Sequence, residues 1–133
     1  MTSSNLDQAR EQISTHLRFL GYEVTINEKT LFARHPQKSN FMLRVFNEGI
    51  MLTSIYNYDD AAKRDRLGYL EFINAANVAA GVVRYYASKD SDFFIEAWYS
   101  GEYKQIDFGR FLELWDTDFE KLAKVPGVEK YLK

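Results

Sequence analysis

The sequence predicts an α+β domain in which three helices pack on an antiparallel sheet of about five strands, in the order α-β-β-β(β)-α-β-β-α. Two groups of short segments alternate apolar and polar residues, and three longer segments carry apolar residues at helical spacing. Short turns join neighbouring strand segments within each group. This arrangement favours hairpins and an antiparallel or mixed sheet over a doubly wound parallel sheet, because parallel strands need a long crossover between each pair.

Length and composition fit one globular domain over residues 1–133, with 46% hydrophobic and 27% charged residues. The aromatic fraction of 16% is high, which indicates that some aromatic side chains lie at an interface. A net charge of −2, with lysine and arginine spread along the chain, disfavours a nucleic-acid partner. Without cysteine there is no disulfide framework and no thiol nucleophile. The first residues lack a secretory signal pattern and no apolar stretch is long enough to span a membrane, so we expect a cytoplasmic protein without membrane contact.

The first half of the chain predicts one helix followed by four strand segments. Residues 5–20 place apolar side chains at helical spacing and end before a glycine, which is typical of a helix. Residues 22–26 and 30–34 alternate apolar and polar side chains, as strands with one buried face do. Two further apolar segments flank residues 47–49, whose sequence Asn-Glu-Gly predicts a three-residue hairpin loop.

The second half predicts a helix, two strands and a last helix. Residues 59–80 begin with acidic side chains and are rich in alanine and leucine, which favours a helix. Residues 82–88 and 92–100 read as two strands around a short turn. Residues 105–124 carry apolar side chains on one face and polar side chains on the other, which predicts the last helix. A proline and a glycine then end this helix and leave a short tail.

The strand segment FFIEAWY, residues 93–99, is apolar on both faces. Phe94 and Trp98 point to one face, and the other apolar residues of the segment point to the opposite face. Three helices cannot cover both faces of such a sheet. Either the helices divide between the two faces, or the second face meets another molecule with Phe94 and Trp98 as partner contacts. The side chains expected on this second face are those of Phe32, Met42, Phe46, Met51, Ile55, Val83, Tyr85, Phe94 and Trp98.

The middle helix, residues 59–80, is also apolar on two sides. One stripe contains aromatic and aliphatic residues that suit the core. A helix that is apolar on two sides packs on two sides. The second stripe therefore packs either on another helix of this chain or on a second copy in a homodimer, and it consists of Leu67, Leu70, Asn74 and Val78.

No motif in the sequence indicates catalysis or metal binding. His16 lies near the edge of the first helix stripe and His35 precedes a proline in a loop, and neither has a partner at metal-ligand spacing. The carboxylates Asp116, Asp118 and Glu120 lie within a strongly periodic helix, so we assign them to a solvated helix face. The glycines are too dispersed to form a phosphate-binding loop. We therefore predict no catalytic residue, no cofactor and no metal site.

Three segments resemble the YbjN-like family of bacterial proteins. They are LGYLEFINAAN at residues 67–77, the strand pair that follows, and FGRFLELWDTDFEKLAK at residues 108–124. Members of this family are described as candidate sensory transduction regulators and share the fold of type III secretion chaperones. The resemblance covers nearly the whole chain in element order, and it rests on apolar positions together with Asn74 and Asn77.

The resemblance implies a sheet of about five antiparallel strands, a homodimer formed through the middle helix, and apolar patches that hold an extended segment of a client protein. It implies no catalytic residues. The chain is less acidic than secretion chaperones are, which departs from their pattern.

Residues and resemblance together predict a noncatalytic protein-interaction module, chaperone-like or regulatory, that binds a protein partner through an apolar sheet surface and forms a homodimer. The alternative is a small enzyme or ligand-binding protein with a pocket between sheet and helices, which a deep cavity lined by tyrosine would favour.

Overall fold

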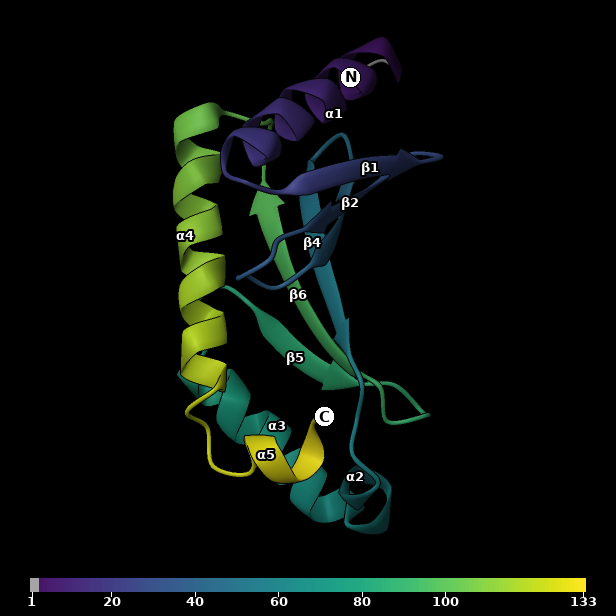
Figure 1. The fold of residues 1–133 in the computed structure, drawn as a ribbon, viewed down its shortest axis with the longest axis vertical. Coiled ribbons are helices and arrows are strands. Elements are labelled where there is room, and N and C mark those ends of the chain that lie inside the picture. The colour runs from purple at the N-terminus through teal and green to yellow at the C-terminus, as the bar shows by residue number, and fades with distance from the viewer. Residues whose placement is uncertain (1–2) are drawn as a thin grey trace.

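The computed structural model of the chain describes residues 3–133, and over this range it contains six strands and five helices (Figure 1). The alternation of strand segments and the three long helical segments explain this order of elements. In chain order they are α1 (Ser3–Phe19), β1 (Glu23–Asn27), β2 (Thr30–Arg34), β3 (Phe41–Val45), β4 (Gly49–Tyr56), α2 (Ala61–Arg64), α3 (Arg66–Ala79), β5 (Arg84–Ala87), β6 (Phe93–Ser100), α4 (Gln105–Leu122) and α5 (Val128–Tyr131).

The strands form one sheet in the order β1-β2-β3-β4-β6-β5, and every neighbouring pair is antiparallel. The hairpin predicted between β3 and β4 is present, and the Phe46 N–H donates to the Gly49 carbonyl at 2.8 Å across it. The chain then leaves the sheet through α2 and α3 and returns as β5 at one edge, after which β6 fills the position beside β4. The predicted α+β class and antiparallel sheet are therefore confirmed, with six strands where about five were expected.

The sequence prediction missed a break in the middle helix and a short helix near the C-terminal end. The segment 59–80 is divided at Asp65, whose backbone is not helical and whose side chain accepts a hydrogen bond from the Gly68 N–H at 3.1 Å, so that it caps α3. The predicted tail is also wrong, because α5 forms there and buries Tyr131 and Leu132. The Asp59 N–H donates to the Tyr131 carbonyl at 2.7 Å, which holds this end of the chain against the start of α2.

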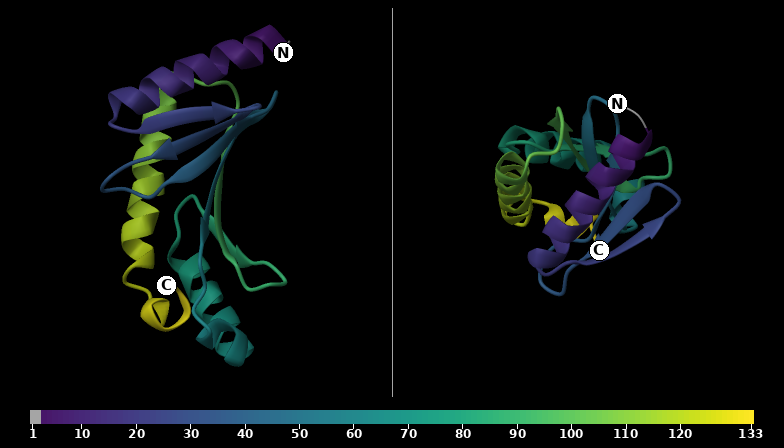
Figure 2. Two further views of the ribbon diagram at one scale, coloured as in Figure 1. Left: turned by 45° about the vertical axis from the view of Figure 1, so that its right-hand side comes forward. Right: turned by 90° about the horizontal axis from the view of Figure 1, so that it is seen from above.

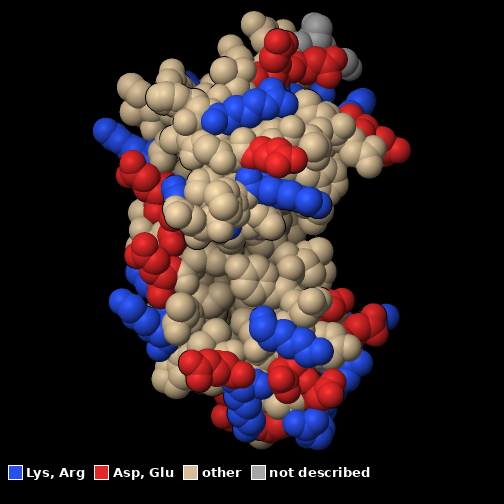
Figure 3. Space-filling model, viewed as in Figure 1, with Lys and Arg blue, Asp and Glu red and all other residues tan. Residues whose placement is uncertain are grey.

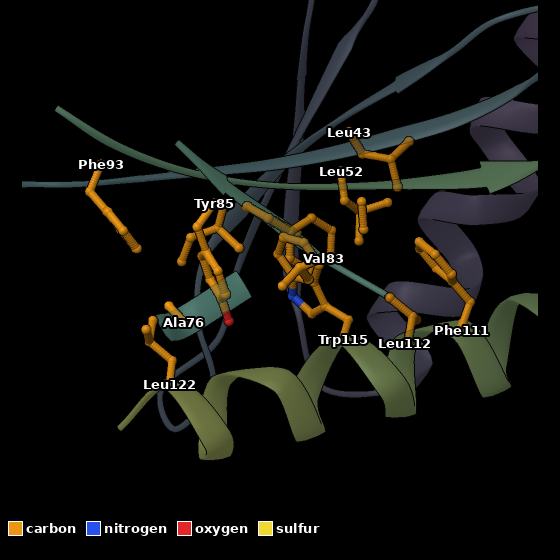
Figure 4. Close-up of a cluster of buried hydrophobic side chains, with 14 of the residues drawn as sticks. Leu43, Leu52, Ala76, Val83, Tyr85, Phe93, Phe111, Leu112, Trp115 and Leu122 are labelled. Atoms are coloured by element: carbon orange, nitrogen blue, oxygen red, sulfur yellow. The ribbon is translucent and has the colours of Figure 1, made fainter. Parts of the chain in front are cut away.

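All the helices lie on one side of the sheet, and the opposite side carries none within residues 3–133 (Figure 2). Phe41 of β3 packs against Trp115 of α4 with ring centroids 5.7 Å apart, and Phe93 of β6 packs against Phe72 of α3 at 5.9 Å. Figure 4 shows Trp115, which is fully buried, rising from α4 into the cluster of sheet side chains. The alternative in which the helices divide between the two faces is therefore wrong.

A buried carboxylate fixes the connection between α3 and β5. The side chain of Asp118 is 1% exposed and accepts hydrogen bonds from three consecutive backbone N–H groups, those of Gly81, Val82 and Val83, at 2.7, 2.8 and 3.0 Å. The prediction that Asp118 lies on a solvated helix face is wrong, because these three donors have no strand or helix partner and need an acceptor from α4.

Side chains from the helices also hydrogen-bond to one residue of each edge strand of the sheet. The Asn77 amide of α3 accepts from the Tyr85 N–H at 2.8 Å and donates to the Tyr85 carbonyl at 3.0 Å, so it occupies both backbone groups of this β5 residue. At the other edge, the Arg18 guanidinium of α1 donates to the Val24 carbonyl of β1 at 3.2 Å. Such caps occupy backbone groups that an added strand would use.

We predict that Asp118→Ala lowers the free energy of unfolding by about 3 kcal/mol, because three backbone donors lose their acceptor. Asp116→Ala on the same helix is the matched control, since Asp116 makes one partly exposed ion pair with Lys38, and it should cost less than about 1 kcal/mol. Urea denaturation of the two variants measures the difference. Equal losses would contradict the role assigned to Asp118.

Candidate functional site

The candidate site is the sheet surface opposite the helices, which we call the open face. The alternation of side chains along each strand places large apolar residues here as well as in the core. Figure 3 does not look onto this face: in the direction of Figure 1 it shows charged side chains toward the two ends of the molecule and a belt of mostly uncharged surface between them. The open face consists of Phe32, Met42, Arg44, Phe46, Met51, Thr53, Ile55, Arg84, Tyr86, Phe94, Glu96 and Trp98.

Trp98 forms one aromatic cluster of the open face. Its indole lies over Gly49 of the neighbouring strand so closely that a Cβ at Gly49 would lie 2.5 Å from the ring, which explains the glycine at this position. Phe46 lies beside the indole with ring centroids 6.0 Å apart, and the Arg44 guanidinium lies 5.7 Å from the Phe46 ring centre. Trp98 and Phe46 are each 41% exposed, so this cluster is available to another molecule.

A second aromatic cluster lies further along β6. The rings of Tyr86 and Phe94 stack almost in parallel at 5.0 Å, since the two residues are directly opposite each other in β5 and β6. Ile55 of β4 is the opposite neighbour of Phe94 and is 49% exposed. Burial raises the pKa of the Tyr86 hydroxyl, and a hydrogen bond to Glu96 adds to the effect.

A polar group separates the two aromatic clusters. Glu96 is only 8% exposed, and its carboxylate accepts from Arg84 at 2.7 Å and from the Thr53 hydroxyl at 3.4 Å. The cross-strand register places these three residues in one row across β4, β6 and β5. The charges of Arg84 and Glu96 therefore neutralise each other within this row. Along β6, the open face presents an apolar zone, then this polar row, then a second apolar zone.

A shallow depression of about 260 Å³ lies beside this polar row, over β2, β3 and β4. Phe32, Met42 and Ile55 line its apolar part. It extends the open face toward β2 and adds a concave apolar part to it.

Phe94 and Trp98, the two residues expected to contact a partner, both belong to the open face. Val83 and Tyr85 do not: both are buried in the core, 8% and 4% exposed, and the prediction that they share the second face is wrong. The physical reason is the register, because Tyr85 lies opposite Ile95 of the core side, and this places Tyr86 on the open face.

Sequence reasoning missed Tyr86, Arg44 and the Arg84–Glu96 ion pair as parts of the site. One signal for the pair was present, since Glu96 is the single charge in FFIEAWY and shares its face with Phe94 and Trp98. A charge in that position needs a cationic neighbour on an adjacent strand. The sequence does not identify that neighbour until the register between β5 and β6 is known.

The second stripe of the middle helix lies on a different surface. Leu67 and Val78 of α3 are 70% and 80% exposed, and Leu70 and Asn74 are exposed as well. No segment among residues 3–133 covers them. The stripe is therefore exposed in the single chain, and self-association through it stays a prediction.

The histidines organise local structure. The His16 Nδ1 lies 2.8 Å from the Tyr103 hydroxyl, and burial lowers the pKa of His16. The His35 Nδ1 accepts hydrogen bonds from the backbone N–H groups of Gln37 and Lys38 at 3.0 and 3.2 Å, which shapes the loop between β2 and β3. Within the described residues, no group of three or more histidine, aspartate or glutamate side chains could hold a metal ion.

The fold is similar to that of a known protein. A crystal structure of YbjN from E. coli, described as a candidate transcription regulator, superimposes on this chain with a TM-score of 0.71, covering 92% of this chain and 94% of YbjN. The sequences are 12% identical, so this likeness shows a shared fold. No protein-family model and no curated protein sequence matches the chain. No helix in residues 3–133 is long and apolar enough to cross a membrane.

We predict that Trp98→Ala lowers the free energy of unfolding by only about 1 kcal/mol, because much of the indole already contacts water. Trp115→Ala is the matched comparison, since Trp115 is fully buried in the core, and it should cost about 4 kcal/mol. Chemical denaturation of the two variants measures this difference. A loss at Trp98 as large as that at Trp115 would mean that the open face is part of the core.

Proposed function

We propose that the protein is a noncatalytic interaction module, chaperone-like or regulatory, whose open face binds an amphipathic helix of a protein partner. The observation that carries this proposal is the pair of exposed aromatic clusters, separated by one polar row, on a sheet face that no segment of residues 3–133 covers. Exposed patches of this kind mark interaction sites, and aromatic residues in them supply much of the binding energy.

A helix suits this surface better than an added strand. Asn77 occupies both outward backbone groups of Tyr85, and Arg18 occupies the Val24 carbonyl, so part of each sheet edge is already occupied. Strand addition needs a free edge, whereas a helix needs only an apolar face of suitable width. The partner therefore lies across the face and leaves the edges unchanged.

The spacing of the two aromatic clusters defines the partner sequence. Phe94 and Trp98 are four residues apart on β6, which corresponds to about 13 Å along a strand. Residues i and i+8 of a helix are about 12 Å apart. A helix that runs along β6 would thus place apolar residues at i and i+7 or i+8 over the two clusters, and a polar residue near i+4 over the Arg84–Glu96 pair.

The charge of the open face adds a second requirement. Arg84 is neutralised by Glu96, whereas Arg44 forms no ion pair with any described carboxylate and lies over Phe46. An acidic residue of the partner near the Phe46–Trp98 cluster would complement Arg44. The predicted partner segment is therefore an apolar and acidic helix.

We expect p-benzoylphenylalanine at position 98 to crosslink in cells to a segment with this pattern. The same crosslinker in place of Leu114, which is 49% exposed on α4 away from the open face, is the matched control. Mass spectrometry of the crosslinked peptides identifies the segment. For a synthetic peptide of that segment, Trp98→Ala should raise Kd by about 30-fold and Leu114→Ala should leave it unchanged.

Crosslinking at position 98 no stronger than at position 114 would contradict the proposed site. Crosslinking to a nucleic acid would contradict a protein partner. It would indicate that the open face stacks the bases of a single strand. An identified segment without helical spacing of apolar residues would contradict the proposed orientation along β6.

We further propose that the protein is a homodimer through the exposed stripe of α3. Light scattering should then give twice the chain mass of 15.6 kDa, and Leu67→Glu with Val78→Glu should give the monomer mass, because two buried charges without partners oppose association. Ile106→Glu with Leu114→Glu is the control, since both residues are exposed on α4. A monomer at all concentrations, or a dimer that survives in the Leu67→Glu, Val78→Glu variant, would contradict this interface.

A further inference from the structure

A pocket of about 550 Å³ lies on the helix side of the sheet, where the end of α4 meets α5, and we call it the C-terminal pocket. Its floor is apolar and its size is within the range of small-molecule sites. The loop between β2 and β3 forms the opposite wall. The floor consists of Tyr56, Phe119, Leu122, Ala123, Val128 and Leu132.

Backbone hydrogen bonds hold the pocket in shape. Leu132 forms an antiparallel bridge with Tyr58, and the Lys133 N–H donates to the Asn57 carbonyl at 3.1 Å. The Tyr131 hydroxyl donates to Asp65 at 2.8 Å, which ties α5 to the start of α3. The pocket wall is therefore preformed, and a ligand does not have to order it.

Two neutral hydroxyl groups lie at or beneath the pocket wall. Ser39 lines the pocket, while its hydroxyl oxygen is buried and has no hydrogen-bond partner among the described residues. Tyr56 is half-buried, its ring lies 6.0 Å from that of Phe119, and burial raises the pKa of its hydroxyl, which therefore stays protonated at neutral pH. A buried hydroxyl without a partner indicates a missing polar contact.

The charges around the entrance disfavour an anion. Lys38 and Asp116 neutralise each other through an ion pair of 3.2 Å. The remaining charged residues that line the pocket are Glu120, Glu129 and Lys133, which leaves an excess of one negative charge. This negative charge would repel an anionic ligand, whereas it would attract a cationic ligand and have little effect on an uncharged one.

We propose that the C-terminal pocket binds a small amphipathic molecule with an aromatic or aliphatic body, one hydrogen-bonding group and no negative charge. The Tyr56 hydroxyl contacts its polar group, and the pocket floor contacts its apolar body. This site is separate from the open face, because Tyr56 and Ile55 are adjacent in β4 and point to opposite sides of the sheet. The proposal therefore stands whether or not the open face binds a protein.

Two fluorescent dyes with the same aromatic body test the charge preference. Phenylnaphthylamine is uncharged and carries one amine N–H, whereas anilinonaphthalenesulfonate adds a sulfonate anion to the same rings. We expect the uncharged dye to bind the full chain more tightly. Glu120→Lys with Glu129→Lys should shift the ratio of the two Kd values by about tenfold toward the anionic dye, because the entrance becomes positive.

Glu71→Lys with Glu102→Lys is the matched control, since it changes the net charge by the same amount at exposed residues that do not line this pocket. All four glutamates are exposed, so these variants should fold. An unchanged ratio in the Glu120→Lys, Glu129→Lys variant, or an equal shift in the control, would overturn the proposal.

Amide shifts in two-dimensional NMR locate the bound uncharged dye. Shifts at Ser39, Phe119 and Val128 support the C-terminal pocket. Shifts confined to Phe94 and Trp98 would overturn it, because the dye would then have bound the open face as an apolar probe. The two proposals can therefore fail independently. Trp98→Ala tests the protein-partner site on the open face, and the charge variants change no residue of that face.

Discussion

Three long helices can cover only one face of a six-stranded sheet, and most features of this molecule depend on that limit. Six strands span about 29 Å and each helix is about 10 Å across, so the three long helices α1, α3 and α4 are wide enough to cover a single face. Trp115, Phe93 and Tyr69 then fill the space between them, each fully buried. The strands nevertheless carry apolar residues on both sides, so the open face remains apolar and exposed.

The edges of the sheet differ from its open face, because polar side chains of the helices hydrogen-bond to backbone groups there. Asn77 takes the place of a neighbouring strand for Tyr85, and Asp118 does the same for the N–H groups of residues 81–83 just before β5. These polar side chains satisfy backbone groups that would otherwise template pairing with another chain. Hydrogen bonds from side chains therefore occupy part of each edge, while no segment of residues 3–133 covers the open face.

The local patterns of the sequence predicted the fold class and the apolar character of the second face, because both follow from periodicity, and they left open whether helices cover that face. They placed Phe94 and Trp98 on the same, second face of the sheet, as the structure has them, since alternation within one strand does not depend on its neighbours. They failed for Tyr85 and Asp118, whose environments depend on contacts far apart in the sequence. A strand as short as β5 shows too few alternations to fix its face, and only its pairing with β6 does so.

β4 contributes to both candidate sites, and its position in the sheet determines how they relate. Ile55 belongs to the open face and Tyr56 lines the C-terminal pocket, so adjacent residues of one strand meet two different surroundings. β4 is hydrogen-bonded to β3 on one side and to β6 on the other. A ligand in the pocket would therefore contact a strand that cannot shift without breaking its hydrogen bonds to both β3 and β6. Because β4 does not move, the binding of this ligand is not coupled to Ile55 on the open face. We therefore expect the two proposed sites to bind independently of each other.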